Sequence, residues 1–277
     1  MSTYSKQGFE FEGIPVSYIQ GGNRGFPILM IHGSGPGAST QGNWRLVLGL
    51  LAEHYQIYAM DLIGFGESGR RSAPPYFDVD LWVRQCRAMI DRISGERLGV
   101  IGHSVSGAIA LKLAAVEKRI EKVLTTGSMG APFTVNDDTM NCWSFPKNDD
   151  GLLALARSTI HDQRHVTPEW LAGRRKILFD DKTYGPYFSK MFEGDRQPYA
   201  EQTYLSDGEI AAVKCPVTMI HGRDDRPFPP EVSIELARKL PKADLYLLAE
   251  CSHSVALEHP EKLLAIANSM FALEKKP

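Results

Sequence analysis

The chain has 277 residues, of which 43% are hydrophobic and 23% are charged. This length and composition are typical of one large globular domain or of a core that carries an inserted subdomain. With 31 basic and 33 acidic residues the net charge is −2, which gives no electrostatic basis for binding nucleic acid or an anionic membrane, so neither is expected as a partner.

The first seven residues lack the apolar segment of a signal peptide, and no run of eighteen apolar residues occurs, so a cytoplasmic location is expected. The cysteines are widely spaced and form no C-x-x-C pair, which favours reduced structural thiols over a zinc site or disulfides. They are Cys86, Cys142, Cys215 and Cys251. No metal or cofactor is expected.

The first part of the chain predicts an antiparallel hairpin followed by alternating strands and helices. Apolar and polar residues alternate over 9–12 and 16–19 on either side of Gly13, as in an edge hairpin. Further apolar segments predict buried strands at 26–31 and 57–60 and helices at 44–51 and 78–93. Between the first strand and the first helix lies a glycine-rich loop, 32–39, whose main-chain N–H groups could face a ligand.

Residues 64–69 contain a formal G-x-G-x-x-G pattern, which invites comparison with a dinucleotide-binding motif. That motif opens a helix in a βαβ unit, whereas 70–75 is polar and ends in two prolines. A nicotinamide or flavin site is therefore not expected here.

The central stretch reads as strand, tight turn and helix. An apolar segment at 98–101 is followed by Gly-His-Ser-Val-Ser-Gly and then by an alanine- and leucine-rich segment at 108–115. Ser104 lies at the corner, as in a nucleophile elbow, where a serine hydroxyl is exposed beside helix N–H groups that stabilise an oxyanion. Such an elbow usually has glycine at the position of Ser106. On this stretch alone, Ser104 could instead be only the N-cap of the helix.

The second part returns to strands after a long helical interval. A strand is predicted at 123–126, and the alternation so far indicates an α/β protein with a mostly parallel central sheet flanked by helices. Helical periodicity at 152–160 and 169–179 predicts an inserted helical lid at 132–208, between core segments 1–131 and 209–277. The remaining expected elements are strands at 217–220 and 245–248 and helices at 231–240 and 260–273.

A serine nucleophile needs a base and an acid that orients the base. Asp225 and His253 each follow a predicted strand, and the order Ser, Asp, His is that of the α/β-hydrolase arrangement. Asp224 is the neighbouring alternative, and the spacing to Pro229 favours Asp225.

These motifs together resemble the α/β-hydrolase superfamily. They are 32–37, 61–69, the Ser104 elbow, 221–225 with Pro229, and 252–260. Within the superfamily the chain is most similar to the meta-cleavage-product hydrolases, which cut a carbon–carbon bond in vinylogous diketo acids made by opening of aromatic rings. The resemblance covers nearly the whole chain and implies the α/β-hydrolase fold.

The resemblance implies a catalytic triad of Ser104, Asp225 and His253, with Ser104 as nucleophile or water activator. It also implies an oxyanion hole made by the N–H groups of Ser34 and Val105. Arg174 matches a lid arginine that contacts the dienoate end of the substrate, and Asn43 matches a polar residue near that end. The full set of implied substrate-binding residues is Gly35, Asn43, His103, Arg174 and Ser254.

Two of these residues have open alternatives. Arg174 beside Arg175 could lie on a solvated helix face, and His103 could pack in the core. His161 and His165 have i, i+4 spacing, which favours two histidines on a helix surface over a metal site.

The sequence departs from the family pattern around the expected triad. The family commonly has Asn before the nucleophile, where this chain has His103, and Gly-His-Trp at the base, where it has Ser252-His253-Ser254. Ser254 in place of a tryptophan removes a wall beside the base.

The expected function is hydrolysis of a 2-hydroxy-6-oxo-2,4-dienoate, a small acidic substrate. A carboxylesterase with the same triad is the alternative, whereas a binding protein without catalysis would need a broken triad. Association into a homo-oligomer, with a dimer as the first expectation, is left open.

Overall fold

An eight-stranded sheet forms the centre of the computed structural model, which describes residues 4–272. The strand order is β1-β2-β4-β3-β5-β6-β7-β8; β1 and β2 are antiparallel to their neighbours, and all other pairs are parallel. The strands are β1 (Tyr4–Phe11), β2 (Ile14–Gly21), β3 (Pro27–Ile31), β4 (Gln56–Met60), β5 (Leu98–His103), β6 (Ile120–Thr126), β7 (Val217–Gly222) and β8 (Ala243–Leu248). The predicted edge hairpin and the α/β class are confirmed.

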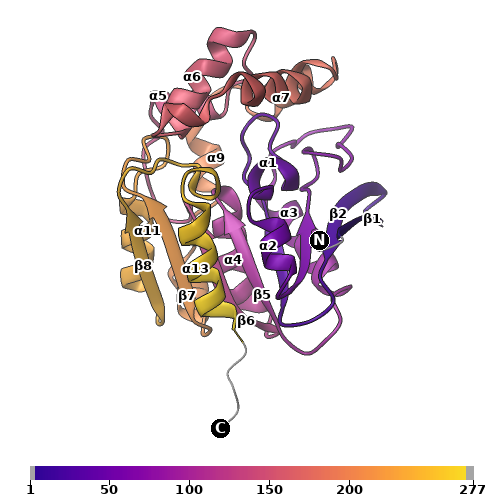
Figure 1. Ribbon diagram of the computed structural model, residues 1–277, viewed down its shortest axis with the longest axis vertical. Helices are drawn as coiled ribbons and strands as arrows, with labels where there is room; N and C mark the ends of the chain where they lie inside the picture. Colours follow the sequence, from indigo (N-terminus) through magenta and orange to yellow (C-terminus); the bar gives the residue numbers. More distant parts are fainter. Residues whose placement is uncertain (1–3, 273–277) are drawn as a thin grey trace.

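Helices cover both faces of the sheet because alternate residues of each strand point to opposite sides. In β3, Leu29 and Ile31 join one hydrophobic cluster, whereas Ile28 and Met30 join the other. The first cluster packs under α3 (Val79–Ile90), α4 (Val105–Val116) and α11 (Glu231–Lys239). The second packs under α1 (Thr40–Trp44), α2 (Leu48–Ala52), α12 (Val255–Glu258) and α13 (Pro260–Phe271), as Figure 1 shows.

Several predicted helix boundaries differ from the structure; the helix expected at 78–93, for example, ends at Ile90. The single helix expected at 44–51 is two short helices, because the Ser39 side chain accepts a hydrogen bond from the N–H of Gly42 and starts α1 at Thr40. The C-terminal helix ends at Phe271, and the predicted end at residue 273 lies outside the described residues.

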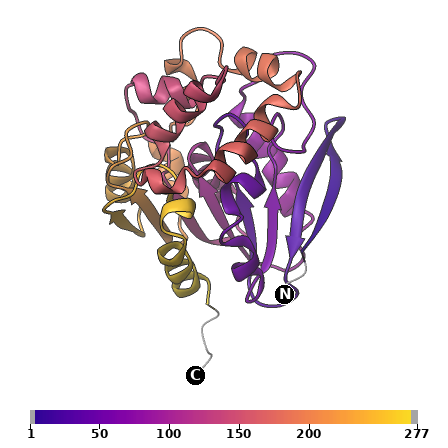
Figure 2. The same cartoon turned by 45° about the horizontal axis from the view of Figure 1, so that its top comes forward.

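A helical segment lies over the carboxyl ends of the strands, at the top of Figure 1 and brought forward in Figure 2. Its elements are α5 (Asp137–Cys142), α6 (Asp149–Thr159), the short 3-10 helix η1 (Gln163–His165), α7 (Pro168–Phe179), α8 (Tyr184–Met191) and α9 (Gln197–Glu201). We propose that 132–208 is the lid. The next helix, α10 (Asp207–Ala212), crosses the predicted boundary at 208 and packs on the core, since its Glu209 pairs with Lys112 of α4 at 3.1 Å.

The glycine-rich stretch 64–69 forms turns around a carboxylate of its own chain. Asp61 Oδ1 accepts from the N–H of Thr40 at 2.7 Å, and Oδ2 accepts from that of Glu67 at 2.9 Å. Gly66 has φ +53°, and a Cβ there would lie 2.2 Å from Asp61 Oδ2. The glycine at this position therefore serves the local packing of the loop.

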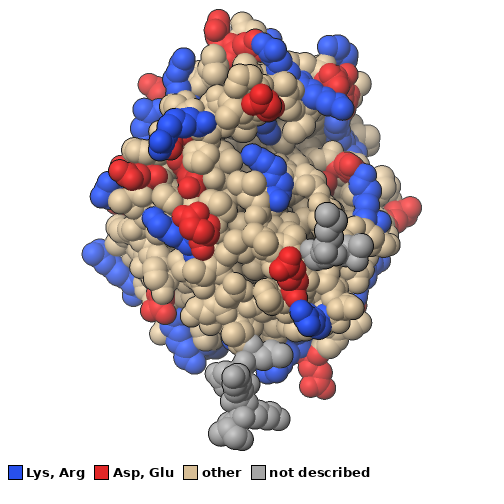
Figure 3. Space-filling view, in the orientation of Figure 1, with Lys and Arg blue, Asp and Glu red and all other residues tan. Residues whose placement is uncertain are grey.

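The described residues also give information on membrane-spanning helices, metal sites, cysteines and surface charge. Between residues 4 and 272, no helix is long and apolar enough to span a bilayer, and no three His, Cys, Asp or Glu side chains are grouped as a metal site would require. All four cysteines are free thiols, and Cys215 is the least buried of them. On the face shown in Figure 3, basic and acidic side chains are interspersed.

Because two histidines are buried, we expect the folded protein to lose stability in mild acid. Burial lowers the pKa of His32, and burial together with the nearby His253 holds the pKa of His103 well below its ordinary value. Burial thus favours the neutral form of both rings in the folded protein, while the unfolded chain takes up a proton at each near pH ~6.5. Between pH 6.5 and 5.5, each histidine should lower the free energy of unfolding by up to about 1.4 kcal/mol per pH unit.

Urea unfolding across this pH range measures the slope. His103→Asn should reduce the slope of the unfolding free energy against pH by the contribution of about one proton. His54→Gln, at an exposed histidine, should leave the slope unchanged. Equal slopes for His103→Asn and the unmodified protein would contradict the assignment.

Candidate active site

Ser104 is held at a sharp corner between β5 and α4. Its backbone has φ 59° and ψ −123°, a conformation that residues with a side chain rarely adopt. Glycine before it allows the turn, because a Cβ at Gly102 would lie 2.1 Å from Ser106 O. The Ser104 side chain makes no cap hydrogen bond to α4, so the alternative in which it serves only as a helix cap is wrong.

Ser106 occupies the position where the elbow pattern usually has glycine. Its side chain is fully buried, and its hydroxyl donates to His32 O at 2.5 Å. The tightest contact of the first helical turn falls instead on Gly107, where a Cβ would lie 2.3 Å from Ser128 Oγ. Serine is therefore accommodated at position 106, where it ties the elbow to the end of β3.

Asp225 and His253 form a buried pair. His253 Nδ1 donates to Asp225 Oδ2 at 2.8 Å, and the N–H of Phe228 donates to Asp225 Oδ1 at 3.0 Å. Burial alone would raise the pKa of Asp225, but the charge of His253 and the hydrogen bonds from His221 and His253 hold that pKa below its ordinary value. Asp225 is thus a carboxylate that orients His253, and the preference for it over Asp224 agrees with this geometry.

The His253 ring is fixed between two other rings. Its centroid lies 4.6 Å from that of His103 and 4.6 Å from that of Phe228. A Cβ at Gly127 would lie 2.9 Å from His253 Nδ1, so the backbone also closes on the ring. Since Nδ1 is bonded to Asp225, Nε2 is the nitrogen that remains to accept a proton. Ser104 and His253 line the same cavity, although no hydrogen bond joins their side chains in this structure.

His103 both lines the cavity and packs in the interior. Its Nδ1 lies 3.0 Å from Thr126 O and 3.0 Å from Thr126 Oγ1, and its ring meets Trp44 edge-on at 6.3 Å. Only 7% of the residue is exposed. The two alternatives for His103 therefore apply together.

The glycine-rich loop after β3 comes close to Ser104. A Cβ at Gly33 would lie 3.1 Å from Ser104 Cβ, so glycine allows the approach. The next residue, Ser34, is held by a hydrogen bond of 3.2 Å from Trp143 Nε1 to its hydroxyl. Val105 is the first residue of α4, so its N–H has no acceptor within the helix. This is the arrangement in which the predicted oxyanion hole would form.

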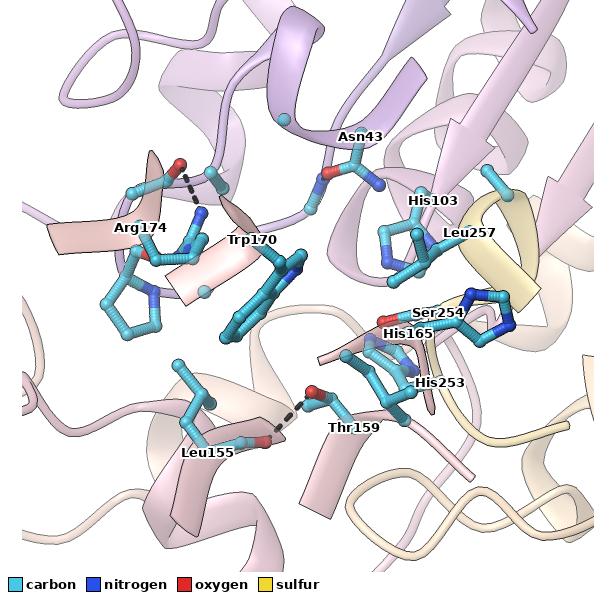
Figure 4. Close-up of a pocket in the computed structure, with 18 of the residues that line it drawn as sticks. Asn43, His103, Leu155, Thr159, His165, Trp170, Arg174, His253, Ser254 and Leu257 are labelled. Carbon is cyan, nitrogen blue, oxygen red and sulfur yellow. Dashed lines mark hydrogen bonds between the residues drawn. The ribbon is translucent and has the colours of Figure 1, made fainter. Parts of the chain in front are cut away.

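A cavity of about 730 Å³ lies between the lid and these core loops. Figure 4 shows part of its lining, with Asn43, His103, Arg174, His253 and Ser254 around one space. Gly35, Ser34 and Ser104 also line it. The structure therefore brings together all five predicted substrate-binding residues with Ser104 and His253, while Asp225 lies behind His253.

Arg174 and its neighbour Arg175 have opposite surroundings. Arg175 pairs with Asp149 of α6, through Nε and Oδ1 at 2.6 Å. Arg174 lines the cavity and donates only to the carbonyl oxygens of Pro36 and Gly37. Burial lowers the pKa of Arg174, yet a guanidinium stays protonated. The cavity therefore contains a cation that no carboxylate of the described residues neutralises.

Thr159, His165 and Trp170 are among the lining residues that were not predicted as site residues. His165 ends a 3-10 helix and His161 lies in the preceding loop, so the prediction of two histidines on a helix surface is wrong. Trp170 stands four residues before Arg174 on α7, a spacing that places both side chains on one helix face. That spacing was the signal in the sequence that could have identified it.

Glu258 joins the loop of the base to the lid. Its Oε1 accepts from the N–H of Ser252 at 2.9 Å, and its Oε2 accepts from those of His161 and Asp162 at 2.6 and 3.1 Å. Two further bonds run in parallel: Ser252 Oγ donates to Ser158 O at 3.2 Å, and Ser254 N donates to Thr159 O at 3.1 Å. The residues on both sides of His253 are thus attached to the end of α6.

The chain is similar to known hydrolases over most of its length. Residues 28–266 match the model of the "Alpha/beta hydrolase family". The chain is 30% identical over 249 residues to the 2-hydroxymuconate semialdehyde hydrolase of Pseudomonas sp. (strain CF600), covering 90% of this chain and 87% of that protein. It is 28% identical to a 2-hydroxy-6-oxo-2,4-heptadienoate hydrolase of Pseudomonas putida, covering 90% of each.

Among solved structures, the meta-cleavage product hydrolase CumD of Pseudomonas fluorescens IP01 superposes with a TM-score of 0.89 at 25% identity. The match covers 95% of this chain and 96% of that one. The similarity to meta-cleavage-product hydrolases inferred from sequence motifs is therefore confirmed.

Glu258→Gln should weaken the attachment between the base loop and the lid. An amide has one oxygen, so it cannot accept from Ser252 on one side and from His161 and Asp162 on the other. We expect a loss of about 1–3 kcal/mol in the free energy of unfolding, measured with urea. Glu261→Gln, at a side chain that is 68% exposed, is the matched control and should change it by less than about 0.5 kcal/mol. Equal losses in the two variants would contradict the role of Glu258.

Proposed function

Because the chain belongs to the α/β-hydrolase family, we propose that it is a serine-triad hydrolase that cleaves the C5–C6 bond of a 2-hydroxy-6-oxo-2,4-dienoate. Such compounds arise from meta ring fission of aromatic molecules, and water cleaves them to a 2-hydroxydienoate and a carboxylic acid. The relatives named above act on substrates of this class.

The observation that carries the proposal is the unpaired positive charge of Arg174 in the cavity, to which Arg45, also without a carboxylate partner among the described residues, adds. Arg174 has no carboxylate partner among the described residues, while Ser104 and His253 lie at another part of the same cavity. A dienoate has a carboxylate at C1 and the carbonyl to be attacked at C6, so it would place its anion at Arg174 and its reacting carbonyl at Ser104. A charge-assisted hydrogen bond from a guanidinium is the interaction expected for that carboxylate.

In the first step the dienol is converted to its keto form. The proton leaves the 2-hydroxyl group and a proton is added at C5, with His253 as the group that transfers it. Asn43 lines the cavity, and its amide oxygen already accepts from the N–H of Gly33 at 3.4 Å, which leaves its NH₂ group to orient the oxygen at C2. The C5–C6 bond then joins a saturated carbon to a carbonyl carbon.

In the second step an oxygen nucleophile adds to C6. The nucleophile is Ser104 Oγ, or a water that Ser104 and His253 activate, and His253 Nε2 accepts its proton. The oxyanion at C6 is bound by the N–H groups of Ser34 and Val105, where each donor is worth about 2.7–4 kcal/mol of barrier. Collapse of this intermediate breaks the C5–C6 bond. Its electron pair forms the C4–C5 double bond and shifts the C3–C4 double bond to C2–C3, and the oxygen at C2 takes the proton held by His253 to give the dienol product. With a water nucleophile the carboxylic acid forms in the same step, whereas with Ser104 Oγ the acyl ester is then hydrolysed by water, with His253 again as base. Asp225 stabilises the imidazolium throughout.

Loss of the coloured dienoate on incubation with the protein tests the proposal. Probes with different groups at C6, namely 2-hydroxymuconate semialdehyde and 2-hydroxy-6-oxo-2,4-heptadienoate, should be hydrolysed, and Ser104→Ala should lower kcat by roughly a thousandfold or more. Turnover of p-nitrophenyl acetate without loss of dienoate colour would instead assign a carboxylesterase. An unchanged rate in Ser104→Ala would overturn the assignment of the nucleophile.

Arg174→Gln should raise KM for the dienoate about tenfold to a hundredfold, because it removes the charge-assisted hydrogen bonds to the carboxylate. Arg175→Gln is the matched control on the same helix, and it removes only the exposed pair with Asp149. Its KM should stay within about twofold of the unmodified protein. Steady-state kinetics with both variants measures the difference, and equal effects would argue against a carboxylate site at Arg174.

A further inference from the structure

Trp170 differs from the other tryptophans of the chain. Trp44, Trp82 and Trp143 are at most 1% exposed, and each contacts another ring. Trp170 is only partly buried, belongs to neither hydrophobic cluster and contacts no aromatic ring of the described residues. Its indole N–H donates to no described group either. A large aromatic side chain is therefore left without a protein partner.

The position of Trp170 explains what the ring faces. It lines the cavity together with Gly173, Arg174 and Ile177, the inward face of α7. Other residues of α7, Leu171, Leu178 and Phe179, pack with the first hydrophobic cluster, whereas the residues of this face line the cavity. A Cβ added at Gly173 would meet no atom within 4 Å, so the space beside the indole is open.

Trp170 also lies along the path that an extended ligand would take. Figure 4 shows its indole projecting into the cavity between Arg174 on one side and His103 and His253 on the other. Ser254, a small residue next to the base, lines the same cavity. The middle atoms of a ligand that reaches from Arg174 to Ser104 would therefore lie beside the indole.

We propose that Trp170 is a substrate-positioning residue that selects planar, conjugated acids by stacking its indole on the conjugated carbons between the carboxylate and the reacting carbonyl. The inference rests on the proposed function for the position of the ligand. Stacking needs a flat partner, so it favours the dienol form over a saturated chain of equal length. The interaction is made in the ground state, and ketonisation places a tetrahedral carbon at C5 and weakens it. Removal of the indole therefore acts on binding more than on the chemical steps.

Binding of two non-reactive probes tests the inference directly. Sorbate (2,4-hexadienoate) and hexanoate have the same length and charge, and only sorbate is conjugated and planar. By calorimetry, we expect the protein to bind sorbate about tenfold more tightly than hexanoate, and Trp170→Ala to bring the two affinities within about twofold. Trp170→Phe, which keeps a flat ring, should restore most of the preference. Lys176→Ala, at an exposed residue of α7 that does not line the cavity, is the control and should keep it.

Kinetics with the dienoate supplies the second measurement. Trp170→Ala should raise KM about tenfold and change kcat by less than about threefold. A loss confined to kcat, or an unchanged preference for sorbate in Trp170→Ala, would overturn the inference while leaving dienoate hydrolysis intact. Failure of the unmodified protein to hydrolyse any dienoate would overturn the proposed function, and the sorbate and hexanoate affinities would still decide the role of Trp170.

Discussion

The active site depends on the left-handed backbone conformation at Ser104. A φ of 59° at a residue with a side chain is unfavourable in isolation, so the surrounding contacts must hold it. They come from several directions: the N–H of Ser104 donates to Thr126 O at 2.9 Å, its carbonyl accepts from Met129 N at 3.1 Å, and Ser106 Oγ bonds to the end of β3. The same contacts bring β3, β5 and β6 together at one point. The loop of the proposed oxyanion hole and the nucleophile are thus positioned by one packing arrangement.

The distribution of charge around the cavity follows from which buried groups have partners. Asp225 is charged because hydrogen bonds from His221, His253 and the Phe228 N–H satisfy its oxygens. His103, which lies against His253, is kept neutral and so does not compete for a proton or repel an imidazolium formed during catalysis. Arg174 and Arg45 line the cavity and have only carbonyl partners among the described residues, so their charge is left for a ligand. The cavity therefore combines one oriented base with uncompensated positive charge, an arrangement suited to an acid that carries its reacting carbonyl several bonds from its carboxylate.

The core could be predicted from the sequence because its signals are local. Short apolar segments that end in glycine alternate with helical periodicity, and Asp225 and His253 follow strands in the expected order. The start of α1 was missed because a single side chain, Ser39, determines it. The lining of the cavity by the lid could not be derived in the same way. Whether Arg174 or Arg175 faces inward depends on how α7 lies against core residues more than a hundred positions away in the sequence. The same packing of α7 determines that the Trp170 ring contacts no other aromatic ring of the described residues.

The attachment of the base loop to the lid by Glu258 limits how the cavity can open. The bonds on either side of His253 lead to the end of α6 and to the loop that follows it. A displacement of the lid at this end would pull away the backbone that carries His253, and the imidazole would lose its alignment with Asp225. A molecule open at the α6 end would therefore have no oriented base, and its nucleophile would be inactive toward water and toward any ester that diffused in. Closure and activation of the site would then be one event, coupled through Glu258 and the two parallel bonds from Ser252 and Ser254.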